Sequence, residues 1–442
     1  MIPILLSGRD ANRVEELRAK LSLRPLLVQG LDDQDGASKF EIVRRILRDV
    51  RERGDAAVLE HTERLDKVKL TAAQMRVPFT QVEEAVRGAK PAFLRALDTA
   101  IENIRVYQTA MLPPEPPPIR AAGGGPTSLL GVKYTPLERV GLYVPGGAAA
   151  YPSSVLHTAI PAQVAGVKEL CLCSPMREGR VSPAVLVAAA KVGVKEIYGI
   201  GGAQAIAAMA FGTATIRAVD KIVGPGNAYV QLAKKELYGI VDIDSFAGPS
   251  EVIVLADDTA DASQVAAELL AQAEHAPGSC LLITPSAQLA TAVQAELERQ
   301  LKLLSREKLT REALTFASAL IVTATHDEAL ALVDRFAPEH LQITTRDADA
   351  AARRVQNAGA IFIGPYTPVA AGDYLAGPSH VLPTSGTGRF FSGLSAESFR
   401  KRTSLIKFDE AALAQSSQAI IDFATTEGFD AHARSVSART TK

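Results

Sequence analysis

Glu339 and His340 stand side by side in the stretch FAPEHLQITT, and a carboxylate beside an imidazole can act as an acid/base pair. Pro338 disfavours a helical conformation for Ala337, so a helix that precedes it is expected to end here. The residues LQITT alternate in polarity and include two threonines, which predicts a strand. We therefore expect the pair at a loop-to-strand junction, either as an acid/base pair or as part of a solvated turn.

A second candidate group lies in the stretch DASQVAAELLAQAEHAPGS, whose apolar residues form a helical stripe. Gln272 and His275 are three residues apart, about one helical turn, so their side chains can converge. Glu268 lies on the same side. The alternative is a polar helix face that ends at Pro277 and Gly278.

Four of the seven histidines stand near Asp, Glu or Gln among turn residues: His275, His340, His380 and His432. Asp373 and His380 belong to a Gly- and Pro-rich loop after the predicted strand AIFIG. Bases and ligands gathered outside regular elements suggest an active site, and mixed nitrogen and oxygen donors suit zinc or a related divalent ion. His61 and His326 lack such neighbours and are predicted on a helix surface and in a loop.

Glycine-containing turns recur next to predicted strands. In IYGIGGAQAIAAMAFG the glycines lie between a strand and an Ala-rich helix, and Gln204 stands where a dinucleotide fingerprint has its third glycine. The stretches YVPGG (143–147), GPGNAY (224–229) and AGPSE (247–251) are expected to follow neighbouring strands. Such turns at the carboxyl ends of parallel strands favour a ligand crevice, although simple tight turns would look the same.

The elements that must position these residues are nine short apolar runs separated by turns and helical stretches, from about residue 140 onward. This alternation predicts an α/β fold with two Rossmann-like domains and largely parallel sheets, both faces of which are covered by helices. Residues 36–110 are predicted mostly helical, and the Pro-rich stretch 111–126 is a connector. The tail after residue 393 is predicted helical and too short for its own core, so it should pack on another domain or another subunit.

Composition narrows the class of protein. The 442 residues carry 48 basic and 49 acidic side chains, which gives no reason to expect a nucleic-acid or membrane partner. No apolar run approaches the ~20 residues needed to cross a bilayer, and no signal peptide is predicted. Cys171, Cys173 and Cys280 are too few for a disulfide framework. Cys171 and Cys173 are expected on one buried strand face rather than at a metal, and a reducing cytoplasm fits best.

Several motifs occur in the order found in histidinol dehydrogenases: YVPGG, GGAQAIAA, VDKIVGPGNAYV, AGPSE, AQAEH, PEHL and AGDY followed by SHVLPT. The chain resembles that family over residues 40 to 435. The resemblance implies a zinc enzyme that oxidises L-histidinol to L-histidine with two NAD⁺ through an aldehyde-level intermediate. It also implies an intertwined homodimer with one Zn²⁺ per subunit and shared active sites.

The resemblance carries over residue by residue. Glu339 and His340 match the catalytic positions, and Tyr143, Gln204 and Asn227 match positions that meet NAD. The zinc-ligand positions are Gln272, His275, Asp373 and His432, the last reaching across from the partner chain. The expected substrate contacts are Ser250, His340, His380, Glu427 and the four metal ligands. Ser379 departs from the asparagine expected before His380, which puts the geometry of that loop in question.

These expectations define the domain boundaries of the chain and the separate roles of the two catalytic residues. Residues 1–35 form an N-terminal extension, 36–139 with 251–393 the catalytic α/β domain, 140–250 the NAD-side domain, and 394–442 a helical tail on the partner. His340 is expected to take the hydroxyl proton and Glu339 to activate water, since two successive oxidations at one carbon need both. The alternatives are a relative that oxidises another amino alcohol, a zinc hydrolase, or a binding protein that has lost activity.

Overall fold

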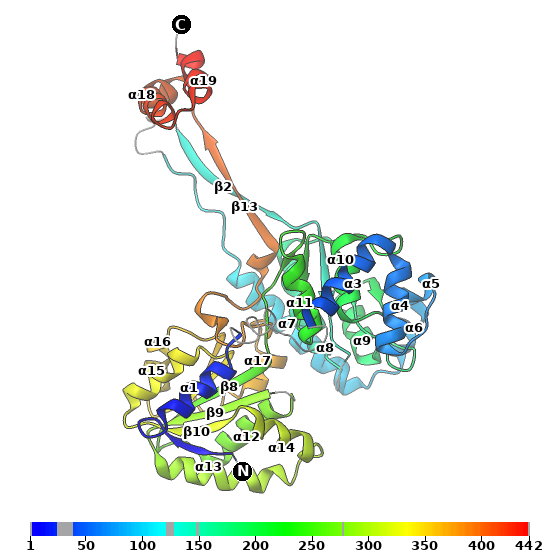
Figure 1. The fold of residues 1–442 in the computed structure, drawn as a ribbon, viewed down its shortest axis with the longest axis vertical. Coiled ribbons are helices and arrows are strands. Elements are labelled where there is room, and N and C mark those ends of the chain that lie inside the picture. The colour runs from blue at the N-terminus through cyan, green and yellow to red at the C-terminus, as the bar shows by residue number, and fades with distance from the viewer. Residues whose placement is uncertain (1, 24–38, 121–127, 147–149, 276–277, 441–442) are drawn as a thin grey trace.

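Two parallel β-sheets, each covered by helices, form the body of the chain, and a long arm leaves this body (Figure 1). The computed structural model describes residues 2–23, 39–120, 128–146, 150–275 and 278–440. The largely parallel α/β architecture predicted from the alternating strands and helices is confirmed.

The first sheet has six parallel strands in the order β1-β10-β9-β8-β11-β12. Its strands are β1 (Ile4–Leu6), β8 (Ser250–Ala256), β9 (Gly278–Thr284), β10 (Ala319–Val322), β11 (His340–Thr344) and β12 (Ala360–Ile363). Its helices are α1 (Ala11–Lys20), α12 (Ala262–Ala273), α13 (Ala287–Leu301), α14 (Glu307–Phe316), α15 (His326–Phe336), α16 (Ala348–Arg354) and α17 (Val369–Tyr374). Val252 and Val254 of β8 pack against α12 and α13, whereas Ile253 and Leu255 pack against α1 and α15. Successive side chains of a strand point to opposite faces, so both faces are buried, as the unbroken apolar runs predict.

The second sheet has five parallel strands in the order β5-β4-β3-β6-β7. They are β3 (Arg139–Tyr143), β4 (Glu169–Cys173), β5 (Glu196–Tyr198), β6 (Lys221–Val223) and β7 (Asp242–Ile243). Four helices alternate along the chain with these strands: α8 (Pro152–Ala165), α9 (Pro183–Lys191), α10 (Gly202–Phe211) and α11 (Ala228–Leu237). Cys171 and Cys173 lie together in the core beside Met209, which confirms their expected packing role.

The N-terminal helices differ from the expected division of the chain. They are α3 (Lys39–Arg53), α4 (Asp55–Asp66), α5 (Ala72–Met75), α6 (Phe79–Arg87) and α7 (Pro91–Met111). Their apolar faces pack on the second sheet: Phe40 and Val43 join the cluster around Met209, and Ile104 joins the cluster around Leu142. The assignment of 36–139 to the catalytic sheet is therefore wrong for these helices, because helical periodicity defines a buried face but not the surface that covers it. The expected extension 1–35 contributes edge strand β1 to the first sheet, and its residues 24–35 lie outside the described part.

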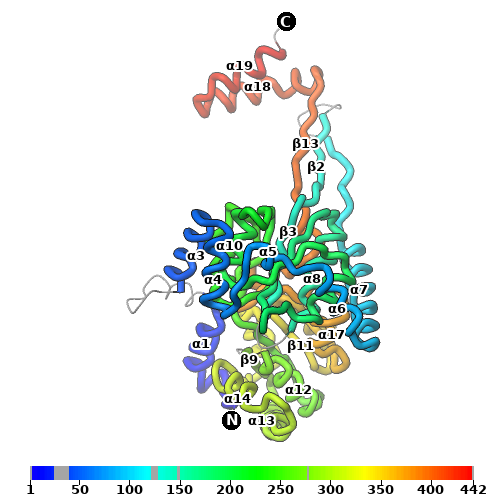
Figure 2. Tube along the Cα trace, turned by 90° about the vertical axis from the view of Figure 1, so that its right-hand side faces the viewer, coloured from blue at the N-terminus to red at the C-terminus, as the bar shows by residue number. Residues whose placement is uncertain are grey.

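The C-terminal tail begins with a strand rather than with a helix. After the short 3₁₀ turns η1 (Thr387–Arg389) and η2 (Ala396–Phe399), β13 (Arg400–Lys407) pairs antiparallel with β2 (Leu129–Pro136). Helices α18 (Glu410–Thr426) and α19 (Asp430–Thr440) follow at the far end of this ribbon. Figures 1 and 2 both show the ribbon and the two helices projecting away from the two sheets. We call residues 129–136 and 400–440 the arm.

The described helices include no candidate membrane span. Across the described ranges, every helix is too short or too polar to span a bilayer.

Candidate active site

Glu339 and His340 lie where the loop after α15 enters β11. Helix α15 ends at Phe336 and is capped by Ala337, whose φ of 52° is left-handed and whose N–H bonds to the Val333 carbonyl. This turn and Pro338 direct the next two residues into the sheet, where His340 pairs in register with Val252. Gly359 lies so close that a Cβ would be 2.6 Å from the Glu339 carbonyl oxygen, so this approach requires glycine. The predicted loop-to-strand junction is confirmed, and the pair is buried rather than a solvated turn.

The Glu339 carboxylate is held by the first residues of the adjacent strand, β8. It accepts hydrogen bonds from the Ser250 hydroxyl and, at 3.1 Å, from the Glu251 N–H. The Gln272 amide donates to the same Ser250 hydroxyl at 2.9 Å. Burial raises the pKa of Glu339, so its carboxylate is a stronger base than an exposed one.

His340 lies between carboxylates. Its Nδ1 is 3.7 Å from Glu339 Oε2 and 3.3 Å from the Glu251 carbonyl, and its Nε2 is 3.7 Å from Asp373 Oδ1. Burial disfavours the imidazolium, but the charges of Glu339 and Asp373 outweigh this and raise the pKa of His340 to about 9. The Nε2 atom is buried and has no hydrogen-bond partner in the described part of the chain. It is thus available to exchange a proton with a bound molecule.

The expected metal ligands come from three places in the chain. Gln272 is buried in the last turn of α12, and His275 follows that helix and is exposed. Asp373 lies on α17, whose first N–H, on Val369, bonds to the buried Glu268 carboxylate at 2.9 Å. Burial alone would raise the pKa of Asp373, but His340, His380 and His275 hold it below its ordinary value. The surroundings of Asp373 thus favour its charged form.

The fourth expected ligand is elsewhere. His432 lies on α19, and Glu427 ends α18, both at the tip of the arm. Within the described residues, no three His, Cys, Asp or Glu side chains are grouped so that they could hold a metal. The single-chain donor set is one imidazole, one carboxylate and one amide oxygen, which suits Zn²⁺ only when a further ligand is added.

His380 connects the two α/β units. Its Nδ1 donates to the Asp373 carbonyl at 3.0 Å, which leaves Nε2 to accept from the Ser154 hydroxyl at 3.1 Å. Burial lowers the pKa of His380, in agreement with this neutral tautomer. Ser379 donates to the His157 carbonyl at 2.9 Å and accepts from the Val381 N–H at 3.2 Å. Ser379 therefore anchors the loop through two hydrogen bonds.

The residues expected to meet NAD lie at the carboxyl ends of the second sheet's strands. Tyr143 ends β3, and its hydroxyl accepts from the Gly202 N–H at 3.1 Å. Gln204 is buried in the first turn of α10 and donates to Asp66 at 3.2 Å. Asn227 caps α11 by accepting from the N–H groups of its second and third residues. The predicted common edge is confirmed for these three turns, although Gly147 of the first turn lies outside the described residues.

Two sequence interpretations need correction. AGPSE follows β7 of the second sheet but also leads into β8 of the first, because Ser250 is the first residue of β8. The catalytic candidates consequently lie at the amino edge of the first sheet. The hydrogen bond between His380 and Ser154 connects this edge to the carboxyl side of the second sheet. His61 is not on a surface: it is buried against Asp49 at 2.9 Å.

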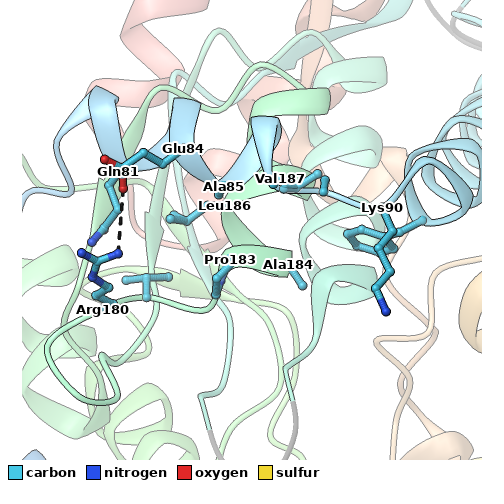
Figure 3. Close-up of a pocket in the computed structure, with 13 residues that line it drawn as sticks. Gln81, Glu84, Ala85, Lys90, Arg180, Pro183, Ala184, Leu186 and Val187 are labelled. Atoms are coloured by element: carbon cyan, nitrogen blue, oxygen red, sulfur yellow. Dashed lines mark ion pairs between the residues drawn. The ribbon is translucent and has the colours of Figure 1, made fainter.

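A separate groove of about 530 Å³ lies between α6, the turn into α7, and α9 (Figure 3). Arg180 and Glu84 form an ion pair at 3.8 Å beside it, and the lining is mostly apolar. None of the residues expected to do chemistry lines this groove, so we do not assign the active site to it.

The comparisons with known proteins decide the family. The family model described as histidinol dehydrogenase matches residues 31–440. The chain belongs to the histidinol dehydrogenase family. A histidinol dehydrogenase of Rhodopirellula baltica is 48% identical over 98% of this chain and 95% of that protein, and one of Bacillus subtilis is 46% identical over 95% and 96%.

The fold agrees with this family. The crystal structure of histidinol dehydrogenase from Elizabethkingia anophelis covers 99% of this chain and 98% of its own, with a TM-score of 0.90 and 33% identity. Membership of the histidinol dehydrogenase family makes the chain an oxidoreductase of histidine biosynthesis. The resemblance seen in the ordered motifs is confirmed.

Proposed function

We propose that this chain oxidises L-histidinol to L-histidine in two NAD-dependent steps, with Glu339 and His340 acting at one carbon. The observation that carries the proposal is the buried pair itself, in which a carboxylate and an imidazole with an unpartnered Nε2 lie side by side. The overall change balances with one water: an alcohol becomes a carboxylate, two NAD⁺ become two NADH, and three protons are released.

In its deprotonated form, which a pKa of about 9 makes the minor form at neutral pH, His340 is the general base of both oxidations. It removes the proton from the substrate hydroxyl in the first step and from the hydrated aldehyde in the second. Glu339 takes a proton from the water that adds to the aldehyde carbon, a role supported by its raised pKa. Ser250 keeps this carboxylate oriented through its hydroxyl.

The carboxyl edge of the second sheet would hold NAD⁺, and each of the two NAD⁺ used per histidinol would accept one hydride there. Tyr143, Gln204 and Asn227 are the proposed contacts. Gly224 supports this assignment, because its φ is 121° and a Cβ there would lie 2.1 Å from the Tyr143 carbonyl oxygen. Only glycine lets the turn come this close to Tyr143, so this turn and the end of β3 lie together at the same edge of the sheet.

Zinc would be held by Gln272, His275 and Asp373 of one subunit with His432 of the other. The metal would supply an electrophilic anchor that orients the substrate's amine and imidazole. Beside this anchor, His380 and Glu427 contact the substrate, and the neutral His380 presents a ring that can accept or donate a hydrogen bond.

The arm supports a homodimer with shared sites. Figure 1 places α18 and α19 at its tip, away from α17 of the same chain; Glu427 directly follows α18, His432 lies on α19, and Asp373 lies on α17. Ile406 and Phe423 are 73% and 72% exposed, and none of the residues of α19 in this isolated chain is buried. An isolated two-stranded ribbon has only marginal stability in water. A second copy of the same chain would cover its exposed apolar side chains.

The direct test is NADH formation with L-histidinol, followed by absorbance with and without a chelator. Two NADH per histidinol, lost on chelation and restored by Zn²⁺, is the expected result. Oxidation of another amino alcohol but not of histidinol would reject the substrate. Absence of NADH with every amino alcohol tried would reject the activity.

A further inference from the structure

Glu251 contacts both proposed catalytic residues, although in the sequence it has no role beyond the last position of the AGPSE motif. It is the second residue of β8 and is 5% exposed. Its N–H donates to the Glu339 carboxylate at 3.1 Å, and its carbonyl oxygen lies 3.3 Å from His340 Nδ1. Its carboxyl Oε1 accepts from the Glu339 N–H at 3.0 Å. The two glutamates therefore bond to each other reciprocally, each carboxyl group accepting from the other's backbone.

The same carboxyl group also holds a second loop. Oε1 accepts from the Ser385 N–H at 2.7 Å, and Ser385 has a left-handed φ of 56°. A serine in that conformation is strained and persists where its surroundings hold it. One buried oxygen thus ties the loop before β11 to the turn near residue 385.

We propose that Glu251 is a positioning residue whose carboxyl group fixes the backbone of Glu339, and thereby the orientation of Glu339 and His340 toward the reacting carbon. This inference rests on the proposed function of those two residues. Glu251 touches no substrate position itself, so it acts only through the pair.

The surroundings indicate which form of Glu251 does this. Burial and the nearby Glu339 both raise the pKa of Glu251 well above its ordinary value, so the neutral acid is favoured. Its Oε2 has no partner among the described residues, and a neutral group needs no counter-charge there. The carbonyl oxygen of a neutral acid accepts two N–H bonds as well as an amide oxygen does. Glutamine should therefore replace Glu251, whereas alanine and the shorter aspartate should not.

The experiment compares Glu251→Gln, Glu251→Ala and Glu251→Asp in the full-length, zinc-loaded enzyme. Glu251→Gln should keep a kcat and a pH profile close to wild type. Glu251→Ala and Glu251→Asp should lose kcat roughly 10²-fold with a smaller change in KM, the size expected for misplacing a catalytic group by about 1 Å. Zinc content should stay the same in all of them.

A second measurement does not depend on activity. Amide hydrogen exchange in the peptide that contains Glu339 and His340 should be faster in the alanine and aspartate variants and unchanged in the glutamine variant. Ser318→Ala is the matched control, since the Ser318 hydroxyl accepts a buried N–H, that of Cys280, at 3.1 Å in the same sheet. This control should lower stability while leaving kcat unchanged.

Several outcomes would overturn the inference. Wild-type kcat in Glu251→Ala, or equal loss in the glutamine and aspartate variants, would do so. If Glu251→Ala does not fold, the comparison of kcat between Glu251→Gln and Glu251→Asp still tests the inference. If the wild-type enzyme makes no NADH from histidinol, the proposed function fails, and the exchange data still show whether Glu251 holds the Glu339 backbone.

Discussion

The ring of His157 lies stacked on the ring of His380, with centroids 4.4 Å apart and planes 30° from parallel. His157 belongs to α8, which covers the second sheet, whereas His380 bonds to Asp373 beside the first. Both ring nitrogens of His157 are buried and lack hydrogen-bond partners among the described residues. A neutral imidazole thus serves as a flat packing surface at the junction of the two units.

This stack predicts a pH dependence of stability. Burial lowers the pKa of His157 well below its ordinary value, so the unfolded chain binds a proton there that the folded chain excludes. The free energy of unfolding should therefore be highest above about pH 6.5 and fall on acidification, by up to about 1.4 kcal/mol per pH unit for this one group. His157→Leu should show a shallower dependence between about pH 6.5 and 4.5. Urea unfolding of both metal-free proteins measures it, and parallel slopes would contradict the prediction.

His340→Gln should nearly abolish both oxidations. An amide cannot accept the hydroxyl proton, and the loss of a general base costs roughly 10²–10⁴-fold in rate. Steady-state kcat with histidinol gives the result, with zinc content as the control for an intact site. Near wild-type turnover would remove His340 from the mechanism.

Glu339→Gln should separate the two half-reactions. If Glu339 activates the water, the variant should oxidise added histidinaldehyde much more slowly, while the first oxidation of histidinol is less affected. Single-turnover NADH formation from each substrate makes the comparison. Equal loss in both half-reactions would reject this division of labour.

His275→Ala should bind less zinc. Imidazole is the strongest of the three proposed same-chain ligands, and the exposed His275 can be replaced without leaving a cavity. Metal analysis after dialysis, compared with His326→Ala as a histidine outside the site, gives the readout. Full occupancy in His275→Ala alone would count against the site.

The shared site can be tested by complementation. His432→Ala and His340→Gln should each be inactive, and mixing them under conditions of subunit exchange should restore activity. In the mixed dimer one site takes its arm from the His340→Gln chain and its base from the His432→Ala chain, so at most about one site per dimer is intact.

The control for this test is exchange itself, followed with differently tagged chains. If the arm serves its own chain, every site in the mixture carries one defect. No recovery despite confirmed exchange would therefore exclude sharing.

The sequence predicted what depends on local pattern. Pro338 and the alternation of LQITT placed Glu339 and His340 at a strand entrance, and the apolar runs predicted buried parallel strands. What it missed depends on which surfaces meet. The periodicity of Phe40 and Val43 defines a helix face, yet either sheet could have covered it.

Two contacts at the site were also beyond local pattern. In the sequence, His157 is one residue of a mostly apolar helix. Its stacking partner, His380, is brought to it only by the packing of α8 on the loop at residue 380. Glu251 looked like the end of a glycine turn, and its role depends on the register that sets β8 beside β11. Both require strand order and helix docking, which one sequence does not specify.

The pairing of β2 with β13 sets an order of events during synthesis. Leu129 lies opposite Lys407, so the first strand of the ribbon emerges from the ribosome long before its partner exists. Until β13 is synthesised, the edge of β2 that it will cover is unpaired. In the same way, β1 has no pairing strand until β10 is synthesised. Contacts of such long sequence separation form slowly. The ribbon therefore closes only after translation is nearly complete, and premature termination before residue 400 leaves a chain with an open, aggregation-prone edge.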